Sequence, residues 1–581
     1  MDTPNSQESE SGKAGNKRIN ESGRNLKKIA RPMGFGSTKK PEIYERLDAL
    51  GLYRLGNELL KKNKIDESIR AYTKAVELNL ATPQLFNNIG LAQYRNNQIN
   101  EAILSYERAL KEDPEFSAAL SNLGVALSFV GRNVEAMKVF DKMTLLYPGD
   151  IGGHFNTGCL YLKLCKYESA IQSFAHTIKL KKDHCEAYNN CGVAFLKLGK
   201  IDLALSHFSA AAEINPRLVD AHLNIGDIFT MKREVDNAIS SYLLVVSAIP
   251  SHPVANYRLG KLYDTLDRPQ EALDCYQSSF ESIEEDKNAS SFLSMILSVL
   301  NLLRLGRIED AVSGLGRAIS LYPFLKDGIA ELDKLDQKNT IAYLTYLSRL
   351  LPLIPLSVPR NAQECLHIGD SHCLSFINQE VEIYGQTYSI APRLVMGAKA
   401  WHLGNSMENS YKRTFENIIK NIQPGAQKIF LSFGEIDCRA GGGIQSYANR
   451  HQISCSDVAA KTARDYFYYA CNKLKHRLHD VFFLGPPPFV LPSTPQDCVN
   501  LDISSQMVET VRAFSLEMSR LCSDSKAKFI NTLSFMSIDD ISKNKSMMID
   551  DYHMRPEVIK LFSKALEIDR EDVLYNNYRQ C

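Results

Sequence analysis

A repeat of 34 residues runs through the first half of the chain and restricts its fold more than any other feature of the sequence. Its most regular members are Gly56, Gly90, Gly124, Gly158, Gly192, Gly226 and Gly260. A small residue follows each glycine after twelve positions and an aromatic residue after sixteen, as Ala102 and Tyr106 follow Gly90. Because three kinds of position share one period, each unit is expected to be a small element that buries its apolar face only by stacking on its neighbours.

This pattern resembles the tetratricopeptide repeat, in which each unit is a pair of helices. A glycine on the first helix and a small residue on the second allow close approach, and the aromatic is expected to fill the space between one unit and the next. An eighth, divergent unit keeps Ala311, Ala318 and Pro323, with Val299 in place of the glycine and Leu315 in place of the aromatic. The resemblance implies an all-α superhelix over residues 41–325 that binds other polypeptides, with the divergent unit docked against the next domain.

Asparagines recur two residues before the glycines, at Asn88, Asn122, Asn156, Asn190 and Asn224. The row resembles the asparagine ladder of O-linked GlcNAc transferases, where this position faces the concave groove. An amide side chain offers a donor and an acceptor, so the row is predicted to bind the backbone of an extended peptide. The alternative is that these amides cap or bridge neighbouring helices. Arg54 and Arg258, at the two ends of the row, are further candidates for binding acidic side chains.

The ends and the composition of the chain exclude several functions. Residues 1–40 are polar, and between Lys13 and Lys40 they carry nine Lys or Arg and one acid, so a disordered basic tail is expected. The net charge of +1 argues against nucleic acid or membrane as a partner. The longest apolar run, Phe292–Leu303, is shorter than the roughly 20 residues of a membrane span and is expected to be a buried helix. The 13 cysteines show no metal-ligand spacing, which favours a cytoplasmic protein with neither metal nor cofactor.

After the repeats the sequence changes to short apolar runs that alternate with helical stretches. We expect a helix and a proline-marked linker over residues 326–361 and an α/β domain over residues 362–581. The predicted strands are Cys365–Ile368, Lys428–Phe433, Val481–Leu484 and Lys528–Asn531. The predicted helices are Ser410–Ile422, Cys455–Leu478, Ser504–Cys522 and Pro556–Glu567. Strands that alternate with helices in this way predict a parallel sheet with helices on both faces.

Three short motifs in this domain resemble those of SGNH (GDSL-type) hydrolases. They are Gly369-Asp370-Ser371-His372, the block that begins at Gly434, and the Asp550–His553 segment. The resemblance implies a flavodoxin-like three-layer fold in which Ser371 is the nucleophile, His553 its general base and Asp550 the residue that orients the imidazole. It also implies that the backbone N–H groups of Ser371 and Gly397 belong to the oxyanion hole.

One departure from the family pattern leaves two functions open. Where the family has an asparagine that donates to the oxyanion, this chain has Ile436; Arg439, His372 and Asn405 are the candidate replacements. The first function is a serine esterase or acyltransferase that acts on an ester or an acylated glycan, the substrate class that the resemblance suggests. The second is a non-catalytic scaffold that retains a degenerate SGNH-like domain. Trp401 is expected in the core, with lining of the pocket as its alternative.

Overall fold

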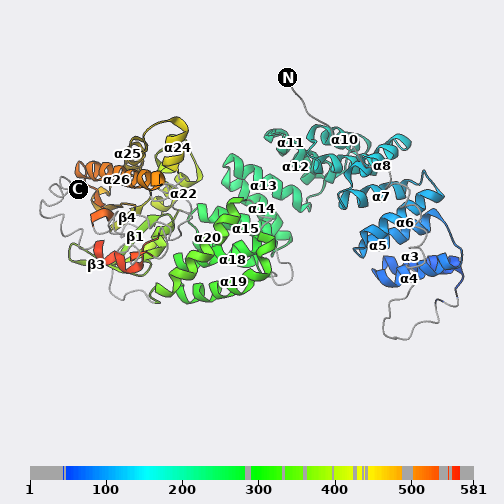
Figure 1. The fold of residues 1–581 in the computed structure, drawn as a ribbon, viewed down its shortest axis with the longest axis horizontal. Coiled ribbons are helices and arrows are strands. Elements are labelled where there is room, and N and C mark those ends of the chain that lie inside the picture. The colour runs from blue at the N-terminus through cyan, green and yellow to red at the C-terminus, as the bar shows by residue number, and fades with distance from the viewer. Residues whose placement is uncertain are drawn as a thin grey trace, which may run out of the picture. The chain divides into compact units, whose positions relative to one another are not determined.

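The structure is a computed structural model of the whole chain and divides into two compact units, Met1–Lys182 and Asp183–Cys581. Figure 1 labels the elements of both units along the chain. The described residues are 44, 47–281, 289–329, 334–356, 363–395, 398–422, 428–434, 438, 443–486, 501–534, 547–548 and 553–562. The predicted basic tail, residues 1–40, lies outside them. Within the described part of the chain, no helix is long and apolar enough to span a membrane.

The first unit consists of helices that pack in consecutive pairs. These are α3 (Ala49–Lys61) with α4 (Ile65–Glu77), α5 (Pro83–Arg95) with α6 (Ile99–Glu112), α7 (Ser117–Phe129) with α8 (Asn133–Leu146), and α9 (Ile151–Lys163) with α10 (Tyr167–Leu180). Side chains cap several first helices; Asp48 accepts from the N–H of Gly51 and Thr82 from that of Leu85.

The second unit continues the pairs. They are α11 (Cys185–Lys197) with α12 (Ile201–Ile214), α13 (Val219–Lys232) with α14 (Val235–Ala248), α15 (Pro253–Thr265) with α16 (Pro269–Ser279), and α18 (Ala289–Arg304) with α19 (Ile308–Ile329). One residue with positive φ lies between the two helices of each pair in either unit: Asn63, Asn97, Gly131, Cys165, Gly199, Arg233, Asp267 and Gly306. A left-handed residue there ends the first helix and turns the chain toward the second.

Each repeat glycine lies against the aromatic ring of its own pair. A Cβ added at Gly260 would lie 2.7 Å from Cδ1 and Cζ of Tyr276, and one at Gly192 would lie 2.7 Å from Cε1 of Phe208. The ring therefore occupies the place that a side chain on the first helix would fill. The ring also shares a core with the next pair, as Tyr72 does with Leu85 and Phe86, so it packs both within its own pair and between units.

We expect Gly260→Ala to lower the free energy of unfolding by about 1–3 kcal/mol, because Tyr276 must move to admit the methyl group. The matched control is Gly316→Ala, also in a helix of the second unit but with nothing within 4 Å of the added Cβ. Its higher helix propensity should raise stability by about 0.5–1 kcal/mol. Urea unfolding followed by circular dichroism measures both. Equal effects of the two substitutions would contradict the packing role of Gly260.

The repeats end differently from the sequence prediction. Helix α19 continues through Pro323 to Ile329, and a further helix, α20, covers Lys334–Leu350 where one helix over 326–350 was expected. A proline inside a helix removes one backbone hydrogen bond. Burial of Leu325 and Ile329 accounts for the extra turn, since both side chains are 3 % exposed.

One continuous core joins the last helices of the repeats to the following domain. It contains buried apolar residues of α16, α18, α19 and α20, among them Leu347 and Leu350. Helix α18 is buried along Phe292–Leu303, as the sequence predicted. The same core includes Leu374 and Ile377, which follow Ser371 along the chain. The beginning of the C-terminal domain therefore packs directly on the end of the repeats.

The C-terminal domain contains a mixed sheet. Its strands are β1 (Gln363–Gly369), β2 (Glu380–Ile383), β3 (Gln386–Leu394), β4 (Lys428–Ser432), β5 (Val481–Leu484) and β6 (Lys528–Ile530). Their order is β2-β3-β1-β4-β5-β6, and all neighbouring pairs are parallel except β2 and β3, which are antiparallel. The fully parallel sheet expected from the sequence is thus modified by one antiparallel strand at its edge.

The edge strand β2 and its partner β3 form a hairpin that the sequence analysis missed. Ile383 pairs with Gln386, so the turn contains only Tyr384 and Gly385, with φ of 54° and 79°. Two central residues with positive φ are typical of a type I′ turn, whose twist matches that of the strands. The Tyr-Gly pair was the available signal; Asn-Gly or Asp-Gly is the more familiar one.

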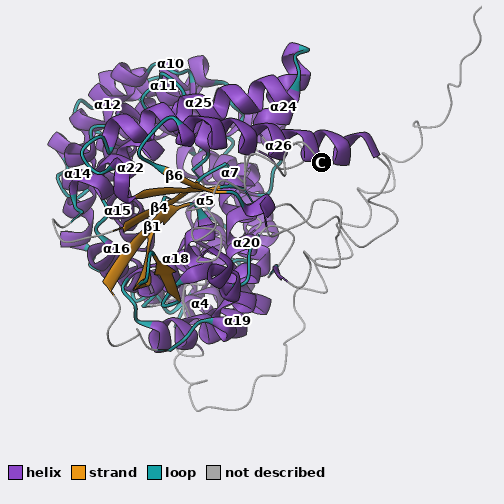
Figure 2. Ribbon diagram, turned by 90° about the vertical axis from the view of Figure 1, so that its left-hand side faces the viewer, coloured by secondary structure: helices purple, strands orange, loops and turns teal. Residues whose placement is uncertain are grey.

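Alternating side chains of the strands build a core on each face of the sheet. Ile429 and Leu431 of β4 contribute to a core shared with the helices of one face, and Phe430 contributes to the other. The helices of the first face are α21 (Ala400–Gly404), α22 (Ser410–Lys420), α24 (Gly443–His451), α25 (Cys455–Lys473) and α26 (Leu501–Ser523). Figure 2 shows α25 and α26 alongside the strands. On the opposite face lie the residues around Met554 and Phe562.

Candidate functional site

Ser371 lies at the carboxyl end of β1, where the chain leaves the sheet and enters the 3-10 helix η2 (Ser371–Phe376). The strand end is tightly packed: a Cβ on Gly369 would lie 2.8 Å from the carbonyl oxygen of Ser432 on β4, and closer still to its Oγ. Only glycine permits this approach between β1 and β4. Asp370 is buried, whereas Ser371 is half-buried, so the turn directs the serine toward a more accessible position than its neighbour.

His553 is brought to Ser371 from the other end of the domain. Its Nε2 lies 2.8 Å from Oγ of Ser371, a separation of 182 residues along the chain. The serine hydroxyl donates this hydrogen bond when Nε2 carries no proton. The backbone that follows the histidine is held in place, since Met554 forms a bridge with Met548 and the N–H of Arg555 donates to the carbonyl of Met547 at 2.7 Å. At 8 % exposure the imidazole is largely shielded from water.

A third side chain, Tyr346 of α20, packs against this pair. Its ring stacks on the imidazole of His553, with ring centroids 3.9 Å apart and planes inclined by 26°. Its hydroxyl donates to the carbonyl oxygen of Ser371 at 3.1 Å and lies 3.0 Å from Oγ of Ser375. The sequence analysis did not single out Tyr346, because no motif surrounds it and its helix was read only as an amphipathic connection.

Several predicted site residues cannot be placed beside Ser371. Asp550, Gly397, Arg439 and Ile436 lie outside the described residues, as does the side chain of His372. Among the alternative donors, Asn405 ends α21, and its Oδ1 accepts from the N–H of Met407 at 3.0 Å. The roles assigned to all of them stay predictions.

The prediction that Trp401 lies in the core is wrong. The side chain is 40 % exposed, because α21 turns Ala400 and Leu403 inward and leaves Trp401 on its outer side. The neighbouring His402 stacks on Tyr411 of α22, with ring centroids 4.2 Å apart. Burial, with a smaller effect from Lys399, lowers the pKa of His402 to about 4, so its imidazole is neutral at physiological pH.

A second serine–histidine contact lies close by in the sheet. Nε2 of His367 on β1 is 2.8 Å from Oγ of Ser432 on β4, the same distance as in the first pair. His367 is fully buried and its ring lies between those of Phe376 and Phe430, with centroids 5.7 and 6.1 Å away. This burial between aromatic rings is typical of a structural contact between strands. It also provides an internal comparison for the pair at Ser371.

The asparagine row takes part in hydrogen bonds between successive pairs of helices. In the first unit, Nδ2 of Asn122 donates to Oδ1 of Asn87 at 2.9 Å, and that of Asn156 to Oγ of Ser121 at 3.1 Å. Asn88 donates to Asn57 at 2.9 Å. These contacts agree with the alternative that the asparagines bridge neighbouring helices. Peptide binding by the same half-buried side chains stays a prediction.

In the second unit Asn224 makes the same kind of bridge, whereas Asn190 contacts its neighbour on the same helix. Nδ2 of Asn224 donates to Oδ1 of Asn189 at 3.0 Å, and Asn190 accepts from Nδ2 of Asn189 at 3.3 Å. Arg258, which the sequence suggested for acidic ligands, forms an ion pair with Asp227 at 2.9 Å. Its charge is thus already matched within the repeats.

Comparison with protein families identifies the helical pairs. A model described as TPR repeat matches residues 56–97, and models described as tetratricopeptide repeat match residues 87–151, 155–218, 192–253 and 254–286. Residues 56–286 are tetratricopeptide repeats. No curated protein matches the chain in sequence.

Several solved structures resemble the chain in part. PilF from Pseudomonas aeruginosa is 18% identical over 33% of this chain and 88% of its own, with a TM-score of 0.32. A tetratricopeptide repeat protein from Parabacteroides merdae is 18% identical over 45% of this chain and 98% of its own, with a TM-score of 0.34. YrrB, described as a TPR protein with an unusual peptide-binding site, is 22% identical over 31% of this chain and 93% of its own, with a TM-score of 0.26.

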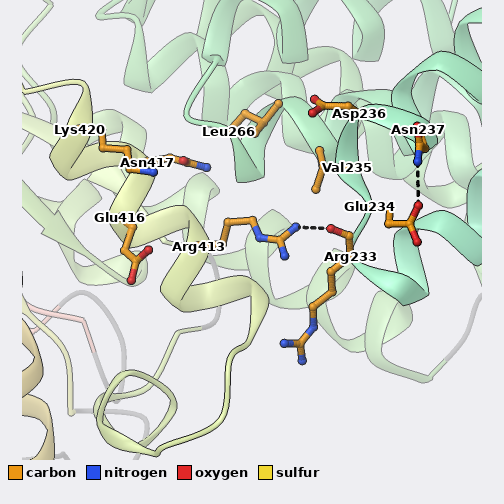
Figure 3. Close-up of a pocket in the computed structure, with 10 residues that line it drawn as sticks. All are labelled: Arg233, Glu234, Val235, Asp236, Asn237, Leu266, Arg413, Glu416, Asn417 and Lys420. Atoms are coloured by element: carbon orange, nitrogen blue, oxygen red, sulfur yellow. Dashed lines mark hydrogen bonds between the residues drawn. The ribbon is translucent and has the colours of Figure 1, made fainter.

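A polar pocket of about 580 Å³ lies where the tetratricopeptide repeats meet α22 within the second unit (Figure 3). Its lining includes the turn between α13 and α14 and, on α22, Arg413, Glu416, Asn417 and Lys420. Nη1 of Arg413 donates to the carbonyl of Arg233 at 2.8 Å, and Nδ2 of Asn417 donates to that of Thr265 at 3.1 Å. Because these carbonyls lie at the ends of α13 and α15, the two side chains of α22 cap the first helices of two repeats.

Proposed function

We propose that this chain is a protein-binding tetratricopeptide repeat protein whose C-terminal domain is an SGNH-type serine esterase or acyltransferase. The proposed boundaries are 41–325 for the repeats, 326–361 for the connection and 362–581 for the catalytic domain. The observation that carries the proposal is the 2.8 Å contact between Oγ of Ser371 and Nε2 of His553. A serine hydroxyl within hydrogen-bond reach of an imidazole is the arrangement that activates a serine nucleophile.

The arrangement of the strands supports the same proposal. The five parallel strands lie in the order β3-β1-β4-β5-β6. Numbered by their order in the chain, this is 2-1-3-4-5, which is typical of flavodoxin-like folds. In such sheets ligands bind beyond the carboxyl ends of the strands. Ser371 lies two residues beyond the carboxyl end of β1, and β1 is the second of the five parallel strands in that order.

The chemistry proposed for this pair is acyl transfer. Oγ of Ser371 attacks the carbonyl carbon of an ester while Nε2 of His553 takes the hydroxyl proton, which gives a tetrahedral oxyanion and an imidazolium. The C–O bond to the alcohol then breaks, and the alcohol leaves with the proton from His553. The acyl-serine passes its acyl group to water or to another hydroxyl by the same steps in reverse. Asp550 would stabilise the imidazolium, and the N–H groups of Ser371 and Gly397, with Arg439, would stabilise the oxyanion.

A serine-directed fluorophosphonate probe tests the proposal. The parent chain should become covalently labelled and Ser371→Ala should not, with the labelled peptide identified by mass spectrometry. Equal labelling of the two chains would overturn the enzymatic function. It would leave the second candidate, a protein-binding scaffold, which the tetratricopeptide repeats favour without any contribution from Ser371.

For the repeats we propose an extended peptide as the partner, bound by the asparagine row. An experiment must separate peptide binding from bridging between repeats, because Asn122→Ala removes both an amide of the proposed groove and the hydrogen bond to Asn87. Asn87→Ala removes the bridge alone, and Asn87 is buried. The two variants are therefore a matched pair.

We expect Asn122→Ala to weaken a peptide selected on the full chain by about fivefold to tenfold, the loss of roughly one hydrogen bond. Asn87→Ala should weaken it by less than twofold. Fluorescence anisotropy with the labelled peptide measures both dissociation constants. Equal losses in the two variants would show that the row acts only as a bridge between repeats.

A further inference from the structure

One residue that packs on the Ser371–His553 pair comes from outside the α/β domain. Tyr346 belongs to α20, the helix that follows the repeats, yet it contacts both members of the pair. Its ring covers one face of the imidazole at a centroid distance of 3.9 Å. Its hydroxyl donates to the backbone of Ser371 at 3.1 Å. The site is thus assembled from α20, the end of β1 and the segment that contains His553.

The repeats in turn hold α20 through contacts at its other end. The hydroxyl of Tyr257, on α15 of the seventh repeat, donates to Oδ2 of Asp336 at 2.8 Å, and Nζ of Lys261 lies 3.9 Å from Oδ1. Asp336 is near the start of α20 and Tyr346 is ten residues later. Between them the helix is fixed by the apolar core that it shares with α18 and α19. A continuous set of contacts therefore joins the seventh repeat to His553.

We propose that Tyr346 is a positioning residue for His553, and that the tetratricopeptide repeats hold it in place through Tyr257 and Asp336. The catalytic consequence rests on the proposed function; the positioning itself does not. The stacked ring limits rotation of the imidazole and keeps Nε2 directed toward Ser371. The hydroxyl fixes the backbone from which Oγ projects. The electron-rich face of the tyrosine also favours the imidazolium that forms when His553 takes the proton.

Three variants of the full chain separate the ring, its hydroxyl and the link to the repeats. Tyr346→Leu removes the stacked ring, and we expect it to slow fluorophosphonate labelling of Ser371 by about 100-fold, since a misplaced catalytic group costs on that order. Tyr346→Phe retains the ring and should label within about tenfold of the parent. Tyr257→Phe breaks the contact with Asp336 and should slow labelling by about fivefold. Tyr263→Phe, on the same helix, is its matched control. Thermal unfolding establishes that each variant is folded.

A second measurement reads the position of His553 without catalysis. In a chain labelled with ¹³C-histidine, the ring signal of His553, assigned with His553→Gln, should be displaced by the ring current of Tyr346. Tyr346→Leu should remove the displacement and Tyr346→Phe should retain it. An unchanged signal in Tyr346→Leu would overturn the proposal, as would parent-like labelling of that variant or equal labelling of Tyr257→Phe and Tyr263→Phe. If the parent is not labelled, the proposed function fails, and the histidine signal alone decides whether Tyr346 positions His553.

Discussion

Replacement of His553 by glutamine should slow the reaction of Ser371 with a fluorophosphonate by about 100-fold to 10,000-fold, the usual contribution of a general base. In the parent, Oγ of Ser371 lies 2.8 Å from Nε2 of His553, and glutamine retains a polar group near that oxygen. It cannot accept the hydroxyl proton, so the serine must react as a neutral alcohol. The pseudo-first-order labelling rate, measured by mass spectrometry of the intact chain, gives the ratio. Ser371→Ala sets the background.

The matched control is Ser432→Ala. Ser432 and His367 have the same 2.8 Å separation between Oγ and Nε2, but His367 is fully buried among aromatic rings. Labelling of Ser432→Ala should remain within about threefold of the parent, because the substitution removes one buried hydrogen bond and no catalytic group. A label on Ser432, or equal rates for the parent and His553→Gln, would contradict the assignment of His553 as the base.

A second large effect is expected at Arg304, at the end of α18. Its side chain is 3 % exposed, and its guanidinium bonds to Asp264 at 2.6 Å and to Asp267 at 2.9 Å. Replacing it with methionine preserves the volume but leaves two buried carboxylates without their cation. Loss of one partner from a buried ion pair costs about 3–5 kcal/mol. We expect Arg304→Met to lower the free energy of unfolding in urea by that amount at pH 7.5.

The pH dependence gives an independent check of this effect. Burial raises the pKa of Asp264 above its usual range, and Arg304 opposes the shift. Without Arg304 the pKa should rise further. A carboxyl whose pKa is higher in the folded state than in the unfolded state favours folding at low pH and loses that contribution as the pH rises. The loss of free energy of unfolding in Arg304→Met, relative to the parent, should therefore be smaller at pH 5 than at pH 7.5.

The control for Arg304 is Arg307→Met, in the connection between α18 and α19. Arg307 pairs with Asp310 at 2.7 Å, but both side chains are about half exposed, at 45% and 55%. Such surface pairs contribute about 0–1 kcal/mol. A similar loss of stability in the two variants would contradict the special role of the buried group.

The repeats were the part of the fold that the sequence predicted best. Gly90 and Tyr106 must be a glycine and an aromatic because one ring occupies the place of the missing side chain, so their period is visible in the residue types. Positions that accept several residues carry no such signal. The left-handed residues between helices include Cys165 and Arg233 as well as asparagine and glycine, and their equal spacing was not recognised.

In the candidate site, residues within short motifs could be predicted, whereas residues placed by the packing of distant segments could not. Ser371 and His553 were predicted from short motifs, and their contact is present in the structure. Tyr346 was missed because its role depends on the packing of α20, which no local pattern specifies. The expected core position of Trp401 failed because residue type alone does not tell which side of a short helix faces inward. Donation by Asn122 to Asn87 likewise depends on how two repeats stack.

The core shared by α18, α19, α20 and η2 has a consequence for the order of folding during synthesis. Its apolar residues extend along the chain from Tyr257 to Leu394. A ribosome releases the last repeat long before it releases Ile377 and Leu394, so the helices of that repeat leave the exit tunnel without the partners that cover them. We expect the earlier repeats to fold during translation and α18 to wait until the strands β1 and β3 have emerged.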